Sequence, residues 1–172
     1  MIISSDWYIA IKGIFSWSTK RLISCLLLVI LLILASCDSR TIYDHNKSMQ
    51  DDVWKSDQII RFDVELKDTV NIHKFYLNLR HNTSYRYANI FLFINTTFPD
   101  GKEARDTVEC ILADPSGKWL GKGISNIRDN QVLLRRGLRF PQQGTYIFEF
   151  EQAMREPELE GIMDLGLRIA RE

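Results

Sequence analysis

The clearest chemistry in this sequence belongs to Cys37, which closes the stretch Leu34-Ala35-Ser36-Cys37. The basic pair Lys20-Arg21 comes before it, and residues 22–34 form a run of 13 mostly apolar residues between the two. A positive region, a short apolar segment and small residues at a cleavage site are typical of a secretory signal, here with a cysteine in the lipoprotein position. We therefore predict a lipoprotein signal peptide over residues 1–36, cleaved between Ser36 and Cys37.

The thiol of Cys37 is the nucleophile that would accept a diacylglyceryl group, and its amine would accept a further chain such as palmitate after cleavage. Each buried methylene contributes ~0.8 kcal/mol, so two or more chains anchor a protein stably at a membrane. As a helix, residues 22–34 would span about 20 Å, less than the ~30 Å hydrocarbon core. This length favours a signal peptide. The alternatives are a signal anchor and a core helix with an incidental cysteine.

The segment after the cysteine is polar and lacks sustained periodicity as far as Asp57. We interpret residues 37–57 as a lipidated tether with local order near Val53-Trp54, and residues 58–172 as the folded domain. The first residues after Cys37 are Asp-Ser-Arg, whereas signals that export a lipoprotein to the cell surface carry an acidic cluster at this place. We therefore expect a lipoprotein of the outer membrane that faces the periplasm.

Composition excludes several classes of protein. The chain has 22 basic and 22 acidic residues, and the leader removes three basic residues and one acid, so residues 37–172 carry a net charge of about −2. The sequence has no block of like charge, so it lacks the basic patch that is typical of nucleic-acid-binding proteins. Cys110 is the one cysteine beyond Cys37, which excludes a disulfide framework. Since Cys110 shares a strand face with Val108 and Leu112, we predict a buried thiol.

From Ile59 onwards the apolar residues recur with period two, which predicts β-strands. Residues 60–66 and 73–79 alternate apolar and polar side chains, while 87–97 is apolar on both faces and suits a central strand. Turn signals such as Pro99-Asp100-Gly101 separate the strands. No stretch has a convincing helical repeat. We predict an all-β, antiparallel sandwich of about eight strands, and the jelly-roll and immunoglobulin-like orders both remain open.

Residues that could support catalysis do not form a recognisable set. The three histidines, His45, His73 and His81, have no metal-ligand spacing, and His73 lies on an apolar strand face. The run 117–123 contains glycines and lysines but lacks the hydroxyl residue of a phosphate-binding loop, so turn and bulge glycines explain it better. Asp164 and Arg168 share a strand face and suit a structural ion pair. We expect no enzyme, no metal and no cofactor.

Two further features carry weaker functional interpretations. Trp54 and Trp119 are the tryptophans outside the leader, and a sugar-binding platform would stack a flat ring on a pyranose; core packing or loop anchoring is the alternative. Thr69 and Thr107 lie in Asp-Thr-Val triplets that resemble the acceptor motif for periplasmic O-glycosylation in the Bacteroidetes lineage. Thr107 also suits an ordinary strand position whose hydroxyl bonds locally.

Several segments, taken in order, resemble the gliding motility-associated lipoprotein GldH family. The resemblance begins with Cys37 and with Trp54 in the tether. Later segments cover most of the chain after the tether: 85–90, 106–109, 117–123, 140–146, 152–155 and 159–169. The resemblance implies a cell-envelope lipoprotein associated with gliding motility machinery, which is linked to protein secretion. It carries over no catalytic residue.

Together these observations favour a non-enzymatic structural or interaction lipoprotein, anchored by its N-terminal lipid, with envelope proteins as partners. Candidate contact residues are Trp119 and Arg155, the latter in a segment that interrupts strand alternation. The alternative is a lipid-anchored carbohydrate-binding module.

Overall fold

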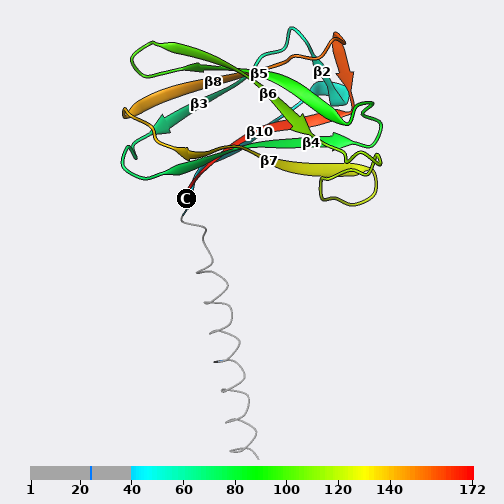
Figure 1. The fold of residues 1–172 in the computed structure, drawn as a ribbon, viewed down its shortest axis with the longest axis horizontal. Coiled ribbons are helices and arrows are strands. Elements are labelled where there is room, and N and C mark those ends of the chain that lie inside the picture. The colour runs from blue at the N-terminus through cyan, green and yellow to red at the C-terminus, as the bar shows by residue number, and fades with distance from the viewer. Residues whose placement is uncertain (1–23, 25–39) are drawn as a thin grey trace, which may run out of the picture. The chain divides into compact units, whose positions relative to one another are not determined.

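The computed structural model describes Ser24 and residues 40–172, which form one β-rich domain from Arg40 onwards (Figure 1). The predicted lipidation residue Cys37 and the cleavage residue Ser36 lie outside the described residues. The elements are β1 (Thr41–Ser48), the helical turn η1 (Gln50–Asp52), β2 (Val53–Lys55), β3 (Ile60–Leu66), β4 (His73–Asn82), β5 (Asn89–Thr97), β6 (Glu103–Ile111), β7 (Ile127–Leu138), β8 (Gly144–Gln152), β9 (Glu158–Glu160) and β10 (Ile162–Arg171). Among these residues no helix is long and apolar enough to cross a membrane.

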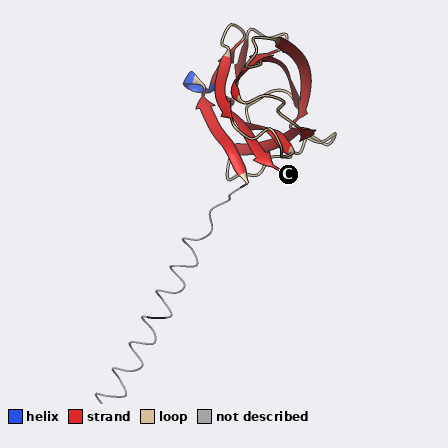
Figure 2. Ribbon diagram, turned by 90° about the vertical axis from the view of Figure 1, so that its left-hand side faces the viewer, coloured by secondary structure: helices blue, strands red, loops and turns tan. Residues whose placement is uncertain are grey.

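Two four-stranded antiparallel sheets make up the domain, in the orders β1-β10-β4-β7 and β3-β8-β5-β6. Figure 2 shows them facing each other, and β2 pairs with β9 in a small third sheet. The pairing is nested: β1 pairs with β10, β3 with β8, β4 with β7 and β5 with β6. A long hairpin folded over in this way is the jelly roll. The predicted antiparallel sandwich is therefore confirmed, and of the two strand orders left open the jelly roll is the one that forms.

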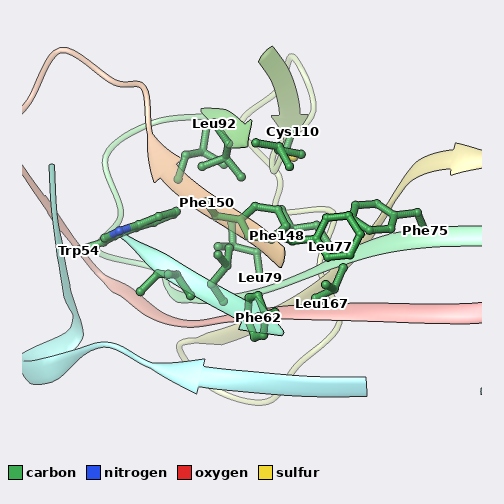
Figure 3. Packing of buried hydrophobic residues seen from close by; sticks show 14 of the residues in the cluster. Trp54, Phe62, Phe75, Leu77, Leu79, Leu92, Cys110, Phe148, Phe150 and Leu167 are labelled. Atoms are coloured by element: carbon green, nitrogen blue, oxygen red, sulfur yellow. The ribbon is translucent and has the colours of Figure 1, made fainter. Parts of the chain in front are cut away.

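Strict alternation explains why the main strands form where they do. β3 is buried at every second residue, and β4 shows the same alternation from His73 to Leu79. Figure 3 shows Leu77 and Leu167 of one sheet packed against Phe148 and Phe150 of the other. Strands whose apolar residues share one face bury that face against a second sheet. β5 lies between β8 and β6, which confirms the central position predicted for it.

The predicted tether over residues 37–57 is wrong from residue 41 onwards. Residues 41–48 form β1, which pairs with β10 along its length, and β2 pairs with β9. Trp54 is fully buried, and its indole N–H donates to the Gln58 carbonyl at 2.9 Å. The edge strand β1 has mostly exposed side chains, but backbone hydrogen bonds to β10 need no side-chain pattern. The folded domain therefore begins about 17 residues earlier than predicted.

Two single-residue predictions concern the core. Cys110 is buried, as predicted, and burial raises the pKa of its thiol to about 11. His73 is also fully buried on the core face of β4, with its ring 5.3 Å from that of Phe140. Its Nε2 lies 3.8 Å from a carboxylate oxygen of Asp68. Both residues are part of the packed interior.

Candidate functional site

One end of the sandwich gathers residues 83–88, 112–126 and 153–161, which are connecting segments apart from the short strand β9, and we call it the contact end. Backbone hydrogen bonds join them to the strands and to each other. The Leu112 and Ala113 amides both donate to the Ala88 carbonyl, at 2.7 and 2.9 Å. The Asn82 amide donates to the Gly161 carbonyl at 2.9 Å. Loops on a rigid scaffold are where proteins most often bind partners, so this end is the first place to look for function.

A chain of aromatic rings runs through the contact end. Trp119 lies 4.5 Å from His81 between ring centroids, His81 lies 5.8 Å from Tyr85, and Tyr85 lies 5.7 Å from Tyr87. The Tyr87 hydroxyl donates to the Glu156 carboxylate at 3.1 Å. Burial raises the pKa of Tyr85, so its phenol stays protonated. The chain thus connects the 112–126 loop, through β4 and the 83–88 loop, to the loop that carries Arg155.

The predicted contact residues Trp119 and Arg155 both lie at this end. Trp119 is half-buried against His81, whereas Arg155 is exposed. The loop of Arg155 is held by Gln152, whose side chain donates to the Glu156 carbonyl at 2.8 Å and accepts from the Met154 amide at 2.9 Å. These bonds explain the broken alternation in the sequence, because Gln152 turns inward to support the loop. The surface around Arg155 is therefore preorganised.

We expect His81 to make the stability of the domain depend on pH. Burial lowers the pKa of His81, since the imidazolium would lose its water, although its Nδ1 lies 2.9 Å from the Asn82 carbonyl oxygen. An unfolded histidine titrates near ~6.5. As pH falls below that value the unfolded chain binds the proton more readily than the folded one, so stability present above it is lost.

We expect the urea midpoint to decrease as the pH is lowered from about 7.5 to about 5.5. A His81→Gln variant should lose part of this pH dependence. The carboxylates with lowered pKa, such as Asp63 and Asp114, lose their contributions at more acidic pH and do not interfere. Equal pH dependence in both proteins would contradict the role of His81.

A second surface is the outer face of the β1-β10-β4-β7 sheet, where polar side chains bond in rows across the strands. In one row Ser48 donates to Asp164 at 2.6 Å, and Arg80 bridges Asp164 and Asp129 at 3.0 and 2.6 Å. Arg168 pairs with Asp44 rather than with Asp164. The predicted ion pair between Asp164 and Arg168 is therefore wrong, because neighbouring strands offer each of them a partner directly opposite.

In the next row Asn78 donates to Asp44 at 3.1 Å and accepts from Gln131 at 3.0 Å. Gly166 lies between these strands, and a Cβ there would come 1.6 Å from the side-chain oxygen of Asn46. The glycine thus lets Asn46 lie across the sheet. The rows border a groove of about 750 Å³, the polar groove, lined by Asp44, Asn46, Asn78, Leu79, Arg80, Ile111, Leu120, Gly121, Lys122, Asp129, Asn130, Gln131, Val132 and Asp164. Sequence alternation marked none of these polar residues as a group.

The remaining candidate residues are not brought together. Thr107 is exposed in the middle of β6, so its hydroxyl is open to modification. Thr69 is half-buried in a turn held by Asp68, whose carboxylate accepts from the Asn71 side chain and amide at 2.8 and 3.1 Å. O-glycosylation at either residue stays a prediction, tested by a mass increment lost in the threonine-to-alanine variant. Within residues 40–172, no group of three or more acidic, histidine or cysteine residues has the arrangement of a metal site.

Comparison with known proteins adds independent information. A family model described as "GldH lipoprotein" matches residues 41–169 and so begins with β1. The "Gliding motility lipoprotein GldH homolog" of Christiangramia forsetii is 32% identical over 148 residues, which cover 82% of this chain and 90% of that protein. The "Gliding motility lipoprotein GldH" of Flavobacterium johnsoniae is 31% identical over 156 residues, which cover 87% of this chain and 96% of that protein. A solved structure of infectious bursal disease virus Gx strain matches with a TM-score of 0.32 at 13% identity, over 77% of this chain and 30% of that one.

Proposed function

The chain belongs to the GldH lipoprotein family, and from that premise we propose that it is a non-enzymatic interaction component of the gliding motility and secretion machinery. Its lipid would hold it at the outer membrane, facing the periplasm. The contact end would then bind another envelope protein. Each of these statements goes beyond family membership and has its own test.

The observation that carries the proposal is the aromatic chain from Trp119 to Tyr87, together with the hydrogen bond from Tyr87 to Glu156, because these contacts join the three segments of the contact end. Tryptophan, tyrosine and arginine are enriched among residues that dominate binding energy at protein interfaces. Trp119 and Tyr87 are half-buried, with Arg86 and Arg155 exposed around them. A preorganised surface of this composition loses little conformational entropy when a partner binds.

Photo-crosslinking in cell membranes tests the proposal. A photoreactive residue would replace Arg155 in one variant and Lys67 in a control variant, followed by affinity purification and identification of the linked proteins. Lys67 is exposed at the other end of the sandwich, because it follows Leu66, which pairs with Gly144 at the start of β8. We expect envelope proteins linked through position 155 and absent at position 67. If a photoreactive residue links no envelope protein at position 155 or at position 119, the proposal is contradicted.

A second candidate function, carbohydrate binding, is favoured by the polar groove. Side-chain amides and carboxylates that alternate as donors and acceptors suit the hydroxyl groups of a sugar. Trp54 takes no part in such a site, because it is fully buried. Binding of peptidoglycan fragments or outer-membrane glycans that is lost in an Asn78→Leu variant, with crosslinking at position 155 absent, would favour this function over the first.

A further inference from the structure

A cleft of about 430 Å³ opens between the edge strands β6 and β7. It lies near the end of the sandwich opposite the contact end, beside the starts of β6 and β8 and the end of β7. Its lining is mainly apolar and comes from both sheets, with Ile94, Phe98, Val108, Leu134, Leu138 and Phe148. The cleft, which we call the edge cleft, is therefore an exposed part of the hydrophobic interior.

The strand β6 shows directly that the core is uncovered there. Cys110 is fully buried, and Val108, Asp106 and Ala104 share its face because strand residues alternate between faces. The pairing of β6 with β5 is continuous, so no bulge changes this alternation. Yet Val108 is only half-buried, and Asp106 and Ala104 are exposed. The two sheets thus separate along β6, and nothing within the described residues covers this half of its inner face.

The edges themselves have unused hydrogen-bonding capacity. β6 pairs only with β5, and β7 pairs with β4 and, at Asp129 alone, with Lys122, so among residues 40–172 neither has a second strand beside it. An exposed strand edge presents a row of backbone donors and acceptors to which another strand can be added. β6 pairs with β5 without a register shift, whereas the register of β7 shifts beside Phe75 and Gly137 has φ of +67°. β6 is therefore the better edge for an added strand.

The rim of the edge cleft is positively charged. Arg135 and Arg139 line it, and both are exposed. Neither guanidinium has a salt bridge or side-chain hydrogen bond within the part of the chain that the structure describes. Asp106 is the single acidic residue in the lining. The unpaired arginines favour a ligand with negative charge next to its apolar part.

We propose that the edge cleft binds an extended segment of a partner protein, which adds as a strand to β6. Alternate apolar side chains of that segment fill the cleft, and an acidic residue near one end pairs with Arg135 and Arg139. A lipid acyl chain would cover the apolar lining but would leave the backbone groups of β6 without partners. A peptide uses the apolar lining, the strand edge and the arginines together, so it is the occupant that the structure favours. This binding is separate from the contact end.

Synthetic peptides test the proposal with the lipidated mature protein in nanodiscs. The probe is an acetylated peptide of sequence EDVTVTVTV, with KKVTVTVTV and EDSTSTSTS as controls for charge and for apolar side chains. The protein variants are R135E/R139E and, as the matched control, R136E. Arg136 is an exposed neighbour on β7 that does not line the cleft. Fluorescence polarisation gives affinity, and hydrogen exchange reports protection of the β6 amides.

We expect the probe to bind at least about tenfold more tightly than either control peptide, and to protect amides of β6 from exchange. R135E/R139E should reverse the preference towards KKVTVTVTV, while R136E stays within about twofold of the native protein. The reversal also shows that the double variant is folded. Palmitate binding without protection of β6, together with no probe binding, would overturn the proposal in favour of an acyl chain. Equal loss in R136E and R135E/R139E would overturn the assigned role of the rim.

Discussion

Replacing Trp54 with alanine is expected to lower the free energy of unfolding by about 3–5 kcal/mol. The indole is fully buried, and β2, which carries it, pairs with β9 so that Trp54 lies opposite Leu159. Alanine would leave a large cavity between this small sheet and the sandwich. It would also leave the Gln58 carbonyl without the indole donor that lies 2.9 Å away. Domains of this size are stable by only about 5–15 kcal/mol in total, so the variant should be close to unfolding at growth temperature.

Urea unfolding followed by circular dichroism measures this effect, and Trp119→Ala is the matched control. Trp119 is half-buried, so we expect its loss to cost about 1–2 kcal/mol, well below the cost at Trp54. Equal effects at the two positions would contradict the packing described here. An unchanged midpoint for Trp54→Ala would mean that residues 53–55 do not unfold together with the sandwich.

The position of Trp54 also shows what periodicity can and cannot predict. β3 and β4 were predictable because one face of each is buried against the other sheet and the other is exposed or half-buried. β1 was not, since its side chains are mostly exposed and its pairing partner β10 follows more than a hundred residues later. Long-range backbone pairing leaves no local signal in a sequence. The same reason explains why the jelly-roll order could not be separated from the immunoglobulin-like one.

The candidate sites divide in the same way. Trp119 and Arg155 were identified by residue type and broken alternation, and the fold places both at the contact end. The polar rows on the outer sheet face and the edge cleft were not identified. Asp106 and Ala104 on the inner face of β6 did carry a signal, because a charged or small residue at a core position marks a poorly covered strand. That signal was readable only once the direction of the strand face was known.

The early start of the domain changes the meaning of the lipid anchor. Only residues 38–40 separate Cys37 from the first residue of β1, Thr41. A fully extended chain of that length reaches at most about 14 Å between the two Cα atoms. A tether up to residue 57 would have allowed several times that distance. If Cys37 carries the lipid, the start of β1 would therefore lie within about 14 Å of the lipidated residue.

Cys37→Ser is expected to remove the lipid entirely, because a hydroxyl cannot replace the thiol nucleophile that accepts the diacylglyceryl group. The acyl mass on the N-terminal peptide should disappear, and so should incorporation of labelled palmitate. Loss of two or more acyl chains removes most of the ~0.8 kcal/mol per methylene that holds the protein at the membrane. Mass spectrometry of the purified protein and acyl labelling in cells measure the change. Label retained in Cys37→Ser would place the lipid elsewhere.

Cys110→Ser separates this effect from a general effect of losing a cysteine. Its thiol is fully buried, and with a pKa raised to about 11 it stays protonated and inaccessible to the modifying enzyme. We expect this variant to keep its lipid and its membrane attachment, but to lose about 1–3 kcal/mol of stability from burying a hydroxyl without a partner. Replacing Cys37 should therefore change membrane attachment, whereas replacing Cys110 should change the stability of the fold. A lipid on Cys37 would hold the domain at a membrane, and the contact end and edge cleft would bind their partners there.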